Sequence, residues 1–238
     1  MLNLKKQSGF TLVEIAIVLV IIGLLLGGIL KGQELINSAR VRNLADQNSG
    51  VQAAYYGFID RYRQVPGDML PLAACQAIGA TNLGVAAGCG TLPAGGDGDG
   101  SLDVENYGEA SALWLHLSAA GFIQGAYDGG AATDAAYQVA TMAPINAFNG
   151  YVMLTRTDNY IPAGGAARLA FVFGDQIPVN IMRELDVKVD DSAPDTGVLR
   201  HSTETGGTTV FNTTAACVTG STWDIDANEQ NCNALLLY

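Results

Sequence analysis

The first part of the chain is a continuous apolar run that carries a single charge. Residues 10–30 read FTLVEIAIVLVIIGLLLGGIL, and Glu14 is the one ionisable residue among these 21. As an α-helix the run would extend roughly 31 Å, about the thickness of a bilayer's hydrocarbon core. It is longer than an ordinary secretory signal core, and no A-x-A-type cleavage site follows Leu30. The pattern predicts a membrane-spanning helix, with a cleaved signal or simple signal anchor as the alternative.

The helical pattern continues beyond the apolar run with mixed polarity. An interrupted apolar stripe runs through residues 31–64, and Pro66-Gly67 is a strong stop signal. One helix is therefore expected from Thr11 to Gln64, roughly 80 Å long if unbroken. We expect its first half, 10–30, to lie in lipid. The amphipathic half, 31–64, is expected to pack under a globular head.

The head, residues 65–238, shows shorter patterns. Residues 71–104 are rich in Gly, Ala and Pro without clear periodicity, which predicts a long loop. A lone histidine on the apolar face of the next helix, His116, is expected to be packed rather than catalytic. The order of long helix, loop and small antiparallel sheet predicts an α+β fold. The elements expected after the loop are a helix at 107–122, strands at 151–155 and 167–173, a short helix at 177–185 capped by Asp175, a strand near 198–202 or 208–212, and a strand at 234–238.

Composition narrows the class of protein. Hydrophobic residues make up 49% and charged residues 15% of the chain, which excludes a disordered chain. The formal net charge is −11 and the isoelectric point about 4.4. From residue 65 onward there are 19 acidic and 5 basic residues, a net charge of −14. A nucleic-acid binder needs a basic face, so we expect no nucleic-acid partner.

The residues around the start of the apolar run carry a specific resemblance. The string KKQSGFTLVE at 5–14 combines a short basic leader, a Gly9-Phe10 junction and an uncharged helix with one glutamate. It closely resembles the class III signal of type IV prepilins and type II secretion pseudopilins. The resemblance implies a leader at 1–9, cleavage after Gly9 by prepilin peptidase and methylation of the new amine on Phe10. It also implies a type IV pilin-like fold.

Glu14 has a physical role to fill in such a chain. Cleavage would leave a positive amine on Phe10 at an apolar helix end, and a buried charge needs a partner. Glu14 of the same chain lies about one turn away, and Glu14 of an adjacent subunit is the other candidate. The alternative is a carboxylate that snorkels to the bilayer surface.

The leading functional hypothesis is a non-enzymatic structural subunit of a type IV pilus or pilus-like filament. The resemblance implies assembly through the N-terminal helix with other pilin or pseudopilin subunits on an inner-membrane platform. It places the anchor in the inner membrane as a single pass, with the head in the periplasm and later in the filament. The large head favours a minor component. The alternatives are a type II secretion pseudopilin and a membrane-anchored adhesin or binding module. G-x-S-x-G, H-E-x-x-H, P-loop and G-x-G-x-x-G strings are absent, so no enzyme is expected.

The four cysteines all follow the apolar run. An even number on that side of the membrane predicts two disulfides. Sequence spacing favours Cys75–Cys89 and Cys217–Cys232, although three pairings are open. Zinc is the alternative, but no C-x-x-C occurs. The C-terminal pair also resembles the disulfide-closed loop of many type IV pilins.

Two acidic stretches follow. In GGDGDGSLDVE at 95–105, Asp97, Asp99 and Asp103 stand at positions 1, 3 and 7 of a half calcium loop, with Ser101 at position 5. The turn glycine and the final glutamate of an EF-hand are missing. The stretch predicts a calcium site, with a solvated acidic turn as the alternative. The second stretch is ELDVKVDDSAPDTG at 184–197. Its part VDDSAPDTG at 189–197 resembles a recurring turn of minor pilins and pseudopilins and is interpreted as structural.

Overall fold

The computed structural model describes residues 11–85, 89 and 95–238. The chain divides into two compact units, residues 1–40 and 41–238, and each is described by itself. We refer to residues 41–238 as the head unit. The predicted Gly9-Phe10 junction lies outside the described residues.

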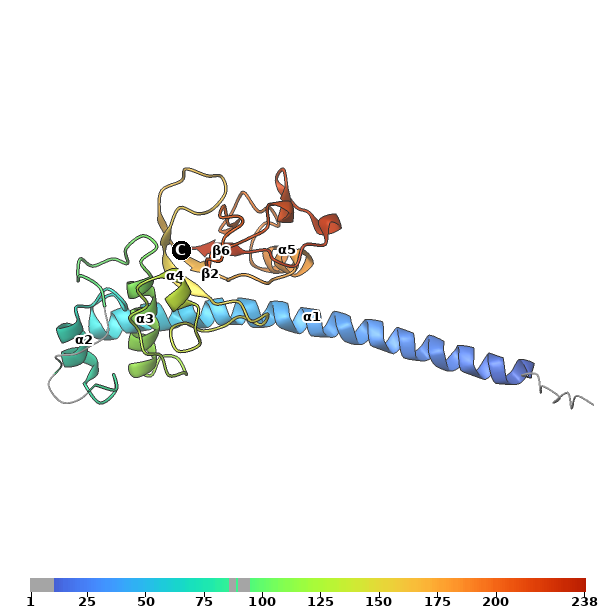
Figure 1. Cartoon of the computed structure of the whole chain (residues 1–238), viewed down its shortest axis with the longest axis horizontal. Helices are drawn as coiled ribbons and strands as arrows, with labels where there is room; N and C mark the ends of the chain where they lie inside the picture. The colour runs from blue at the N-terminus through green and yellow to red at the C-terminus, as the bar shows by residue number, and fades with distance from the viewer. Residues whose placement is uncertain (1–10, 86–88, 90–94) are drawn as a thin grey trace, which may run out of the picture. The chain divides into compact units, whose positions relative to one another are not determined.

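Helix α1 (Leu12–Tyr62) is one continuous 51-residue helix, close to the predicted span of Thr11 to Gln64 (Figure 1). It ends where the backbone of Arg63 turns into the left-handed region at φ 56°. The Arg63 N–H donates to the carbonyl of Ile59 at 2.8 Å, which is the hydrogen bond of a left-handed helix cap. Pro66 follows and prevents the helix from resuming.

The part of α1 in the first unit is apolar and exposed. Every side chain from Thr11 to Leu30 is exposed. Among the described residues, α1 alone has the length and composition to cross a membrane. Apolar side chains exposed along a whole helix need a non-aqueous surrounding. This stretch is therefore suited to anchor the chain in a membrane.

The part of α1 in the head unit buries a stripe. Val41, Leu44, Val51 and Phe58 are buried at helical spacing and belong to the same apolar core as the strands. The hydroxyl of Tyr238 at the C-terminus donates to Oδ1 of Asn48 on α1 at 2.6 Å. The amphipathic half of the helix thus supplies one wall of the head core.

The sheet that faces this wall is small and antiparallel. Its four strands are β1 (Met153–Thr157), β2 (Arg168–Val172), β6 (Ala234–Leu237) and β3 (Leu199–His201), in that spatial order. Register pairs Leu154 with Phe171 and Phe171 with Leu236, so large apolar side chains line up across the sheet. All of β6 is buried. The long helix and the antiparallel sheet confirm the predicted α+β layout, which is like that of type IV pilins.

The remaining elements show where local patterns failed. Helix α2 (Pro71–Ile78) lies inside the stretch predicted as a long loop, so that prediction was wrong for residues 71–78, while the other described residues up to 104 form no helix or strand. Pro71 occupies the first helical turn, where its missing N–H costs nothing. Helix α3 (Tyr107–Ala119) is capped by Asn106. Helix α5 (Val179–Val189) begins after Pro178 and is not capped by Asp175. Smaller elements are α4 (Asp134–Tyr137), a hairpin of β4 (Val218–Thr219) and β5 (Thr222–Trp223), and the 3-10 helices η1 (Ala215–Cys217) and η2 (Ile225–Ala227).

Candidate functional site

The first turn of α1 is closed by a reciprocal pair of hydrogen bonds between Thr11 and Glu14. The Glu14 carboxylate accepts from the backbone N–H and the hydroxyl of Thr11, both at 2.8 Å. In return, the Glu14 N–H donates to the Thr11 hydroxyl at 3.3 Å. This is a capping box, whose T-x-x-E signature stands in the sequence but was not among the predicted features. Glu14 therefore stabilises the start of the helix in addition to carrying a negative charge.

Two disulfides fasten the loops of the head unit. Cys75 on α2 is bonded to Cys89, and Cys217 to Cys232, with Cα–Cα distances of 5.8 and 5.7 Å. This is the pairing that sequence spacing favours. Loops of this size each contribute roughly 3 kcal/mol in the chain-entropy treatment. The second disulfide encloses the β4–β5 hairpin and η2, so that region is fixed although it has little regular structure.

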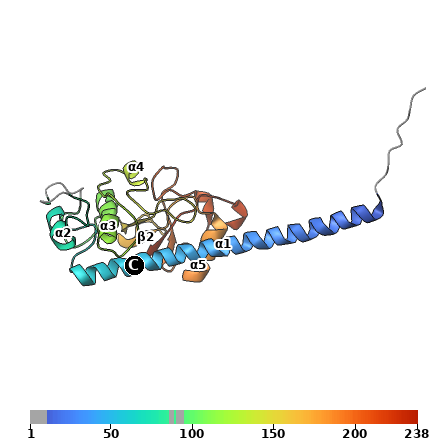
Figure 2. The same ribbon diagram turned by 90° about the horizontal axis from the view of Figure 1, so that it is seen from below.

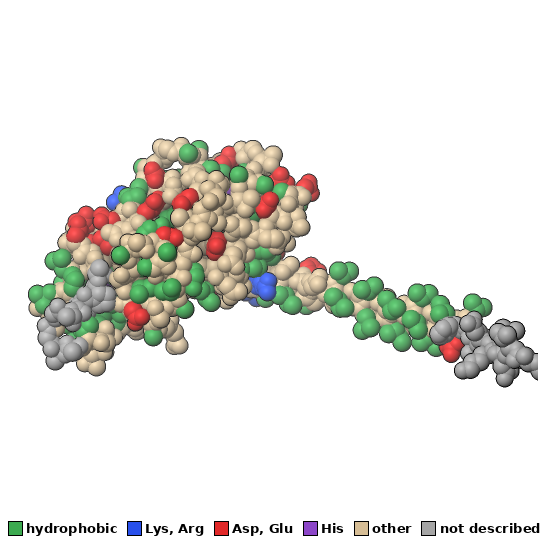
Figure 3. Space-filling model, viewed as in Figure 1, with side chains coloured by type: hydrophobic (Ala, Val, Ile, Leu, Met, Phe, Trp, Pro, Cys, Tyr) green, Lys and Arg blue, Asp and Glu red, His purple; other side chains and the backbone are tan. Residues whose placement is uncertain are grey.

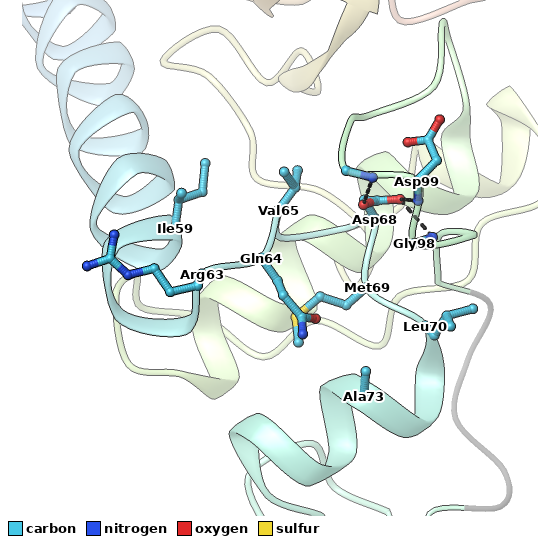
Figure 4. A pocket seen from close by; sticks show the side chains of 11 residues that line it. Ile59, Arg63, Gln64, Val65, Asp68, Met69, Leu70, Ala73, Gly98 and Asp99 are labelled. Atoms are coloured by element: carbon cyan, nitrogen blue, oxygen red, sulfur yellow. Dashed lines mark hydrogen bonds between the residues drawn. The ribbon is translucent and has the colours of Figure 1, made fainter.

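The glycine-rich acidic loop is built around a buried carboxylate from a distant part of the chain. Asp68 is 3% exposed. Its carboxylate accepts from three successive backbone N–H groups, those of Gly98, Asp99 and Gly100, at 2.9, 3.2 and 2.9 Å (Figure 4). A Cβ atom on Gly96 would lie 2.2 Å from the Asp68 backbone, so glycine is required there. Two further glycines of this segment, Gly98 and Gly100, have positive φ angles of 79° and 97°, which glycine adopts at no steric cost.

A second buried carboxylate, Glu109, approaches the same place from the first turn of α3. It is 2% exposed and accepts from the Asp103 N–H at 2.6 Å. The pKa of Glu109 is raised to about 7, mainly because the carboxyl is buried and also because the charges of Asp103, Asp68 and Asp97 lie near, while the hydrogen bond from the Asp103 N–H lowers it. Oxygen atoms of Asp68, Asp97 and Glu109 lie within 4.8 Å of one another. We call these three residues the carboxylate cluster.

The predicted calcium ligands are thus only partly brought together. Asp97 belongs to the carboxylate cluster. Asp99 instead accepts from the backbone N–H and hydroxyl of Ser101, at 2.8 and 3.1 Å. Asp103 accepts from the Asn106 amide at 3.2 Å. Glu109 closely follows the acidic stretch at 95–105 in the sequence, but nothing in the sequence predicted that Asp68 would join the cluster.

The second acidic stretch serves the fold in the structure. Asp186 on α5 accepts from the Trp223 indole N–H at 2.6 Å and from the Ser192 N–H at 3.2 Å. The Asp190 carboxylate accepts from the N–H groups of Val198 and Leu199. These bonds tie α5 to β3 and to the disulfide-closed region, as the structural interpretation of this stretch requires.

Both histidines are buried and hydrogen-bonded. Nδ1 of His116 accepts from the Gly67 N–H at 3.0 Å, and Nε2 of His201 lies 2.9 Å from the Thr213 hydroxyl. Burial lowers the pKa of each to about 4. At neutral pH both are therefore uncharged packing residues.

The head unit also carries an open pocket of about 420 Å³ at the end of α1. It lies between the last turn of α1, the start of α2 and the loop at 98–100 (Figure 4). Ile59, Val65 and Leu70 give it apolar surface, while Arg63 and Asp99 stand on opposite sides.

Comparison with known proteins identifies one motif. Residues 4–30 match the family model of the prokaryotic N-terminal methylation motif. No curated protein and no solved structure matches the chain. The chain therefore carries the N-terminal signal of a prepilin-like precursor, consistent with the class III signal of type IV prepilins and pseudopilins. The motif implies processing by prepilin peptidase and assembly with other pilins.

Proposed function

We propose that the mature chain is a non-enzymatic structural subunit of a type IV pilus or pilus-like filament. The observation that carries the proposal is that the methylation motif at 4–30 coincides with an apolar stretch of α1 whose side chains, from Thr11 to Leu30, are all exposed. Such a helix is stable in lipid before assembly and against the helices of other subunits afterwards. The disulfide-fastened head then faces the periplasm and later the filament surface.

Processing converts the N-terminus into an assembly group. Prepilin peptidase cuts between Gly9 and Phe10 and methylates the new amine, leaving Thr11 as the second residue. In the capping box the Glu14 carboxylate accepts from the Thr11 N–H, and Thr11 is one residue from the proposed new amine in the sequence. Glu14 so balances the amine of its own chain or that of a neighbouring subunit on the inner-membrane platform. Either pairing fixes helix register because an unpaired charge in an apolar bundle is costly.

Intact-mass analysis of the membrane-extracted chain tests the proposal directly. The expected mass corresponds to a chain that starts at Phe10 and carries one methyl group. A chain that starts at Met1, or one that starts beyond Leu30, would contradict the filament-subunit proposal.

A type II secretion pseudopilin is the second candidate, because the same motif serves both systems. Deletion of the gene that encodes this chain distinguishes the pilus subunit from the pseudopilin. Loss of surface filaments or of their function supports a pilus, whereas accumulation of folded secreted proteins in the periplasm supports a pseudopilus. Binding of the purified chain to a host or cell surface, with both phenotypes absent, would favour the membrane-anchored adhesin.

We further propose that the carboxylate cluster holds a hard divalent cation such as calcium. Oxygen atoms of three carboxylates gather there, and oxygen is the donor that calcium takes. Asp97 is the exposed member and Glu109 a buried one, while Asp68 already accepts three N–H bonds. The cation would offset the mutual repulsion of these charges.

Melting of the full-length chain in detergent, in calcium against chelator, tests the cation. At free calcium about a hundredfold above the dissociation constant the stabilisation is ~2.7 kcal/mol. Asp97→Asn should abolish the shift. Asp99→Asn is the matched control and should retain the shift, because the Asp99 carboxylate closes a local turn and lies outside the carboxylate cluster. Identical melting curves in calcium and chelator would remove the cation from the proposal.

A further inference from the structure

We infer that the pocket at the end of α1 receives an exposed isoleucine from η2 of a second copy of this chain, so that head units join end to end. The inference rests on the proposed function and deepens it, because it names a contact between neighbouring subunits. The proposed contact has two halves. One is a projecting apolar side chain beside an exposed carboxylate, and the other is an apolar pocket beside an exposed arginine.

The projecting half is Ile225, the first residue of η2. It is 46% exposed although it is large and apolar. Asp226 beside it is exposed, and its carboxylate makes no hydrogen bond or ion pair among the described residues. The position is rigid, since the Asp224 carboxylate accepts from the N–H groups of Asp226 and Ala227, both at 3.2 Å. The Cys217–Cys232 disulfide closes the segment around it. A fixed apolar side chain held out in water is a feature of binding surfaces.

The receiving half is the pocket of about 420 Å³. Ile59, Val65 and Leu70 line it, and Leu70 is 51% exposed. This space admits an isoleucine side chain and part of the turn that carries it. Burial of the exposed apolar surface on both sides would favour the contact.

Arg63 supplies the charge that matches Asp226. The guanidinium lies 3.4 Å from Asp60, but both side chains are about 80% exposed, so this ion pair is weak and exchangeable. Arg63 also occupies the left-handed cap of α1, a position that glycine usually takes. Retaining an arginine on such a backbone points to a use for its side chain.

The wider charge pattern also favours this partner. Residues 41–238 hold 21 acidic and 8 basic residues, so basic side chains are scarce on this unit. Carboxylates are spread over the visible face in Figure 3. Asp99 on the opposite side of the pocket would repel Asp226 and direct it toward Arg63. Like-charge repulsion of this kind fixes orientation more than affinity.

The two halves lie at opposite ends of the head unit. In Figures 1 and 2 the pocket end is marked by α2, and the red segment that contains η2 lies at the other end, beyond α5. A contact between different patches of the same molecule is heterologous, and it grows into an open chain when rotation does not close a ring. The pairing therefore produces an open row of head units.

Cysteine cross-linking in cells that make the full chain tests the inference. The double variant Val65→Cys, Ile225→Cys places one thiol in the pocket and one on η2. Because each copy would link to two neighbours, a ladder of disulfide-linked multimers is expected on a non-reducing gel. Each single variant should give no ladder. The pair Val104→Cys, Ile225→Cys is the matched control, since Val104 is 49% exposed but lies outside the pocket.

Charge reversal in the double-cysteine chain tests the ion pair independently. Arg63→Glu should weaken the ladder at least several-fold, as should Asp226→Arg, and the two together should restore it. Arg61→Glu is the control, because Arg61 is exposed on the same helix end but does not line the pocket. Asp99→Asn should strengthen the ladder.

The outcomes separate this inference from the proposed function. A ladder that follows the charge series supports both. No ladder, in cells where sheared filaments still contain the processed chain, overturns the end-to-end contact and leaves the filament subunit standing. Processed chain that never enters any filament overturns the proposed function and this inference with it.

Discussion

The two parts of α1 present the same backbone to opposite surroundings. In residues 12–30 every side chain is exposed and, Glu14 apart, none is charged, whereas in 41–62 a stripe is buried in the head core. The first part gains its stability from a lipid or protein surrounding outside its own head unit. The second gains it from the chain's own sheet. One helix thus serves two purposes. Substitutions in its first part should impair entry into filaments, and substitutions in its second part should lower the free energy of unfolding.

Glu14 is the position where we expect the greatest loss. Glu14→Ala should be processed normally but enter filaments at least tenfold less, because it loses both the counter-charge and the capping bond to Thr11. Glu14→Gln keeps a capping partner and loses the charge alone. Comparison of the two in sheared-filament fractions therefore separates the roles. Normal incorporation of both variants would contradict the charge-pairing argument.

Phe58→Ala tests the other part of the same helix. Phe58 is fully buried in the head core, so its truncation should lower the free energy of unfolding by about 3–5 kcal/mol. Chemical denaturation of the detergent-solubilised chain would measure the loss. Cleavage at Gly9 should be unaffected, because the peptidase signal lies in the other unit. A matched change in the exposed stretch, Leu24→Ala, should leave the unfolding free energy nearly unchanged.

Trp223→Phe extends the test to a polar contact inside the head. It removes the indole N–H that donates to buried Asp186 and leaves that carboxylate short of a partner. An unsatisfied buried acceptor of this kind costs about 1–3 kcal/mol. Adding Asp186→Asn or Asp186→Leu should recover part of the loss if the penalty comes from the unpaired charge. Equal stabilities of the wild type and Trp223→Phe would show that the bond contributes little.

A weaker effect concerns the pH dependence of stability. Each histidine has an ordinary pKa of 6.5 that burial lowers to about 4, so its contribution to stability is complete above pH 6.5 and is lost as the pH falls toward 4. The slope is at most about 1.4 kcal/mol per pH unit for each histidine. Glu109, with its raised pKa of about 7, acts in the opposite direction between pH 7 and 4.5.

The variant His201→Gln isolates the histidine contribution to this pH dependence. Gln keeps a partner for Thr213 but does not titrate, so the variant should lose less stability than the wild type between pH 6.5 and 4.5. Urea denaturation at both pH values would measure the difference. Parallel loss in the two proteins would show that His201 is not the group responsible.

Features that depend on neighbouring residues could be predicted from the order of the amino acids alone. The long helix, the apolar run and the α+β order follow from periodicity and stop signals, and the methylation motif is a contiguous string. The disulfides joined cysteines that are close in sequence. Where a local signal was overlooked, as with the capping box of Thr11 and Glu14, it was nonetheless present in the string.

Features that join distant segments emerged only when the head folded. Asp68 binds the loop at 98–100, about thirty residues further along the chain. Helix α2 forms inside a stretch with little periodicity, and the Cys75–Cys89 disulfide links it to the loop that follows. The carboxylate cluster, the pocket beside Arg63 and the projecting Ile225 likewise depend on which segments pack together. Sequence periodicity reports which side of an element is apolar. It does not report which distant backbone N–H groups will satisfy a buried carboxylate, because that choice is made when the whole head folds.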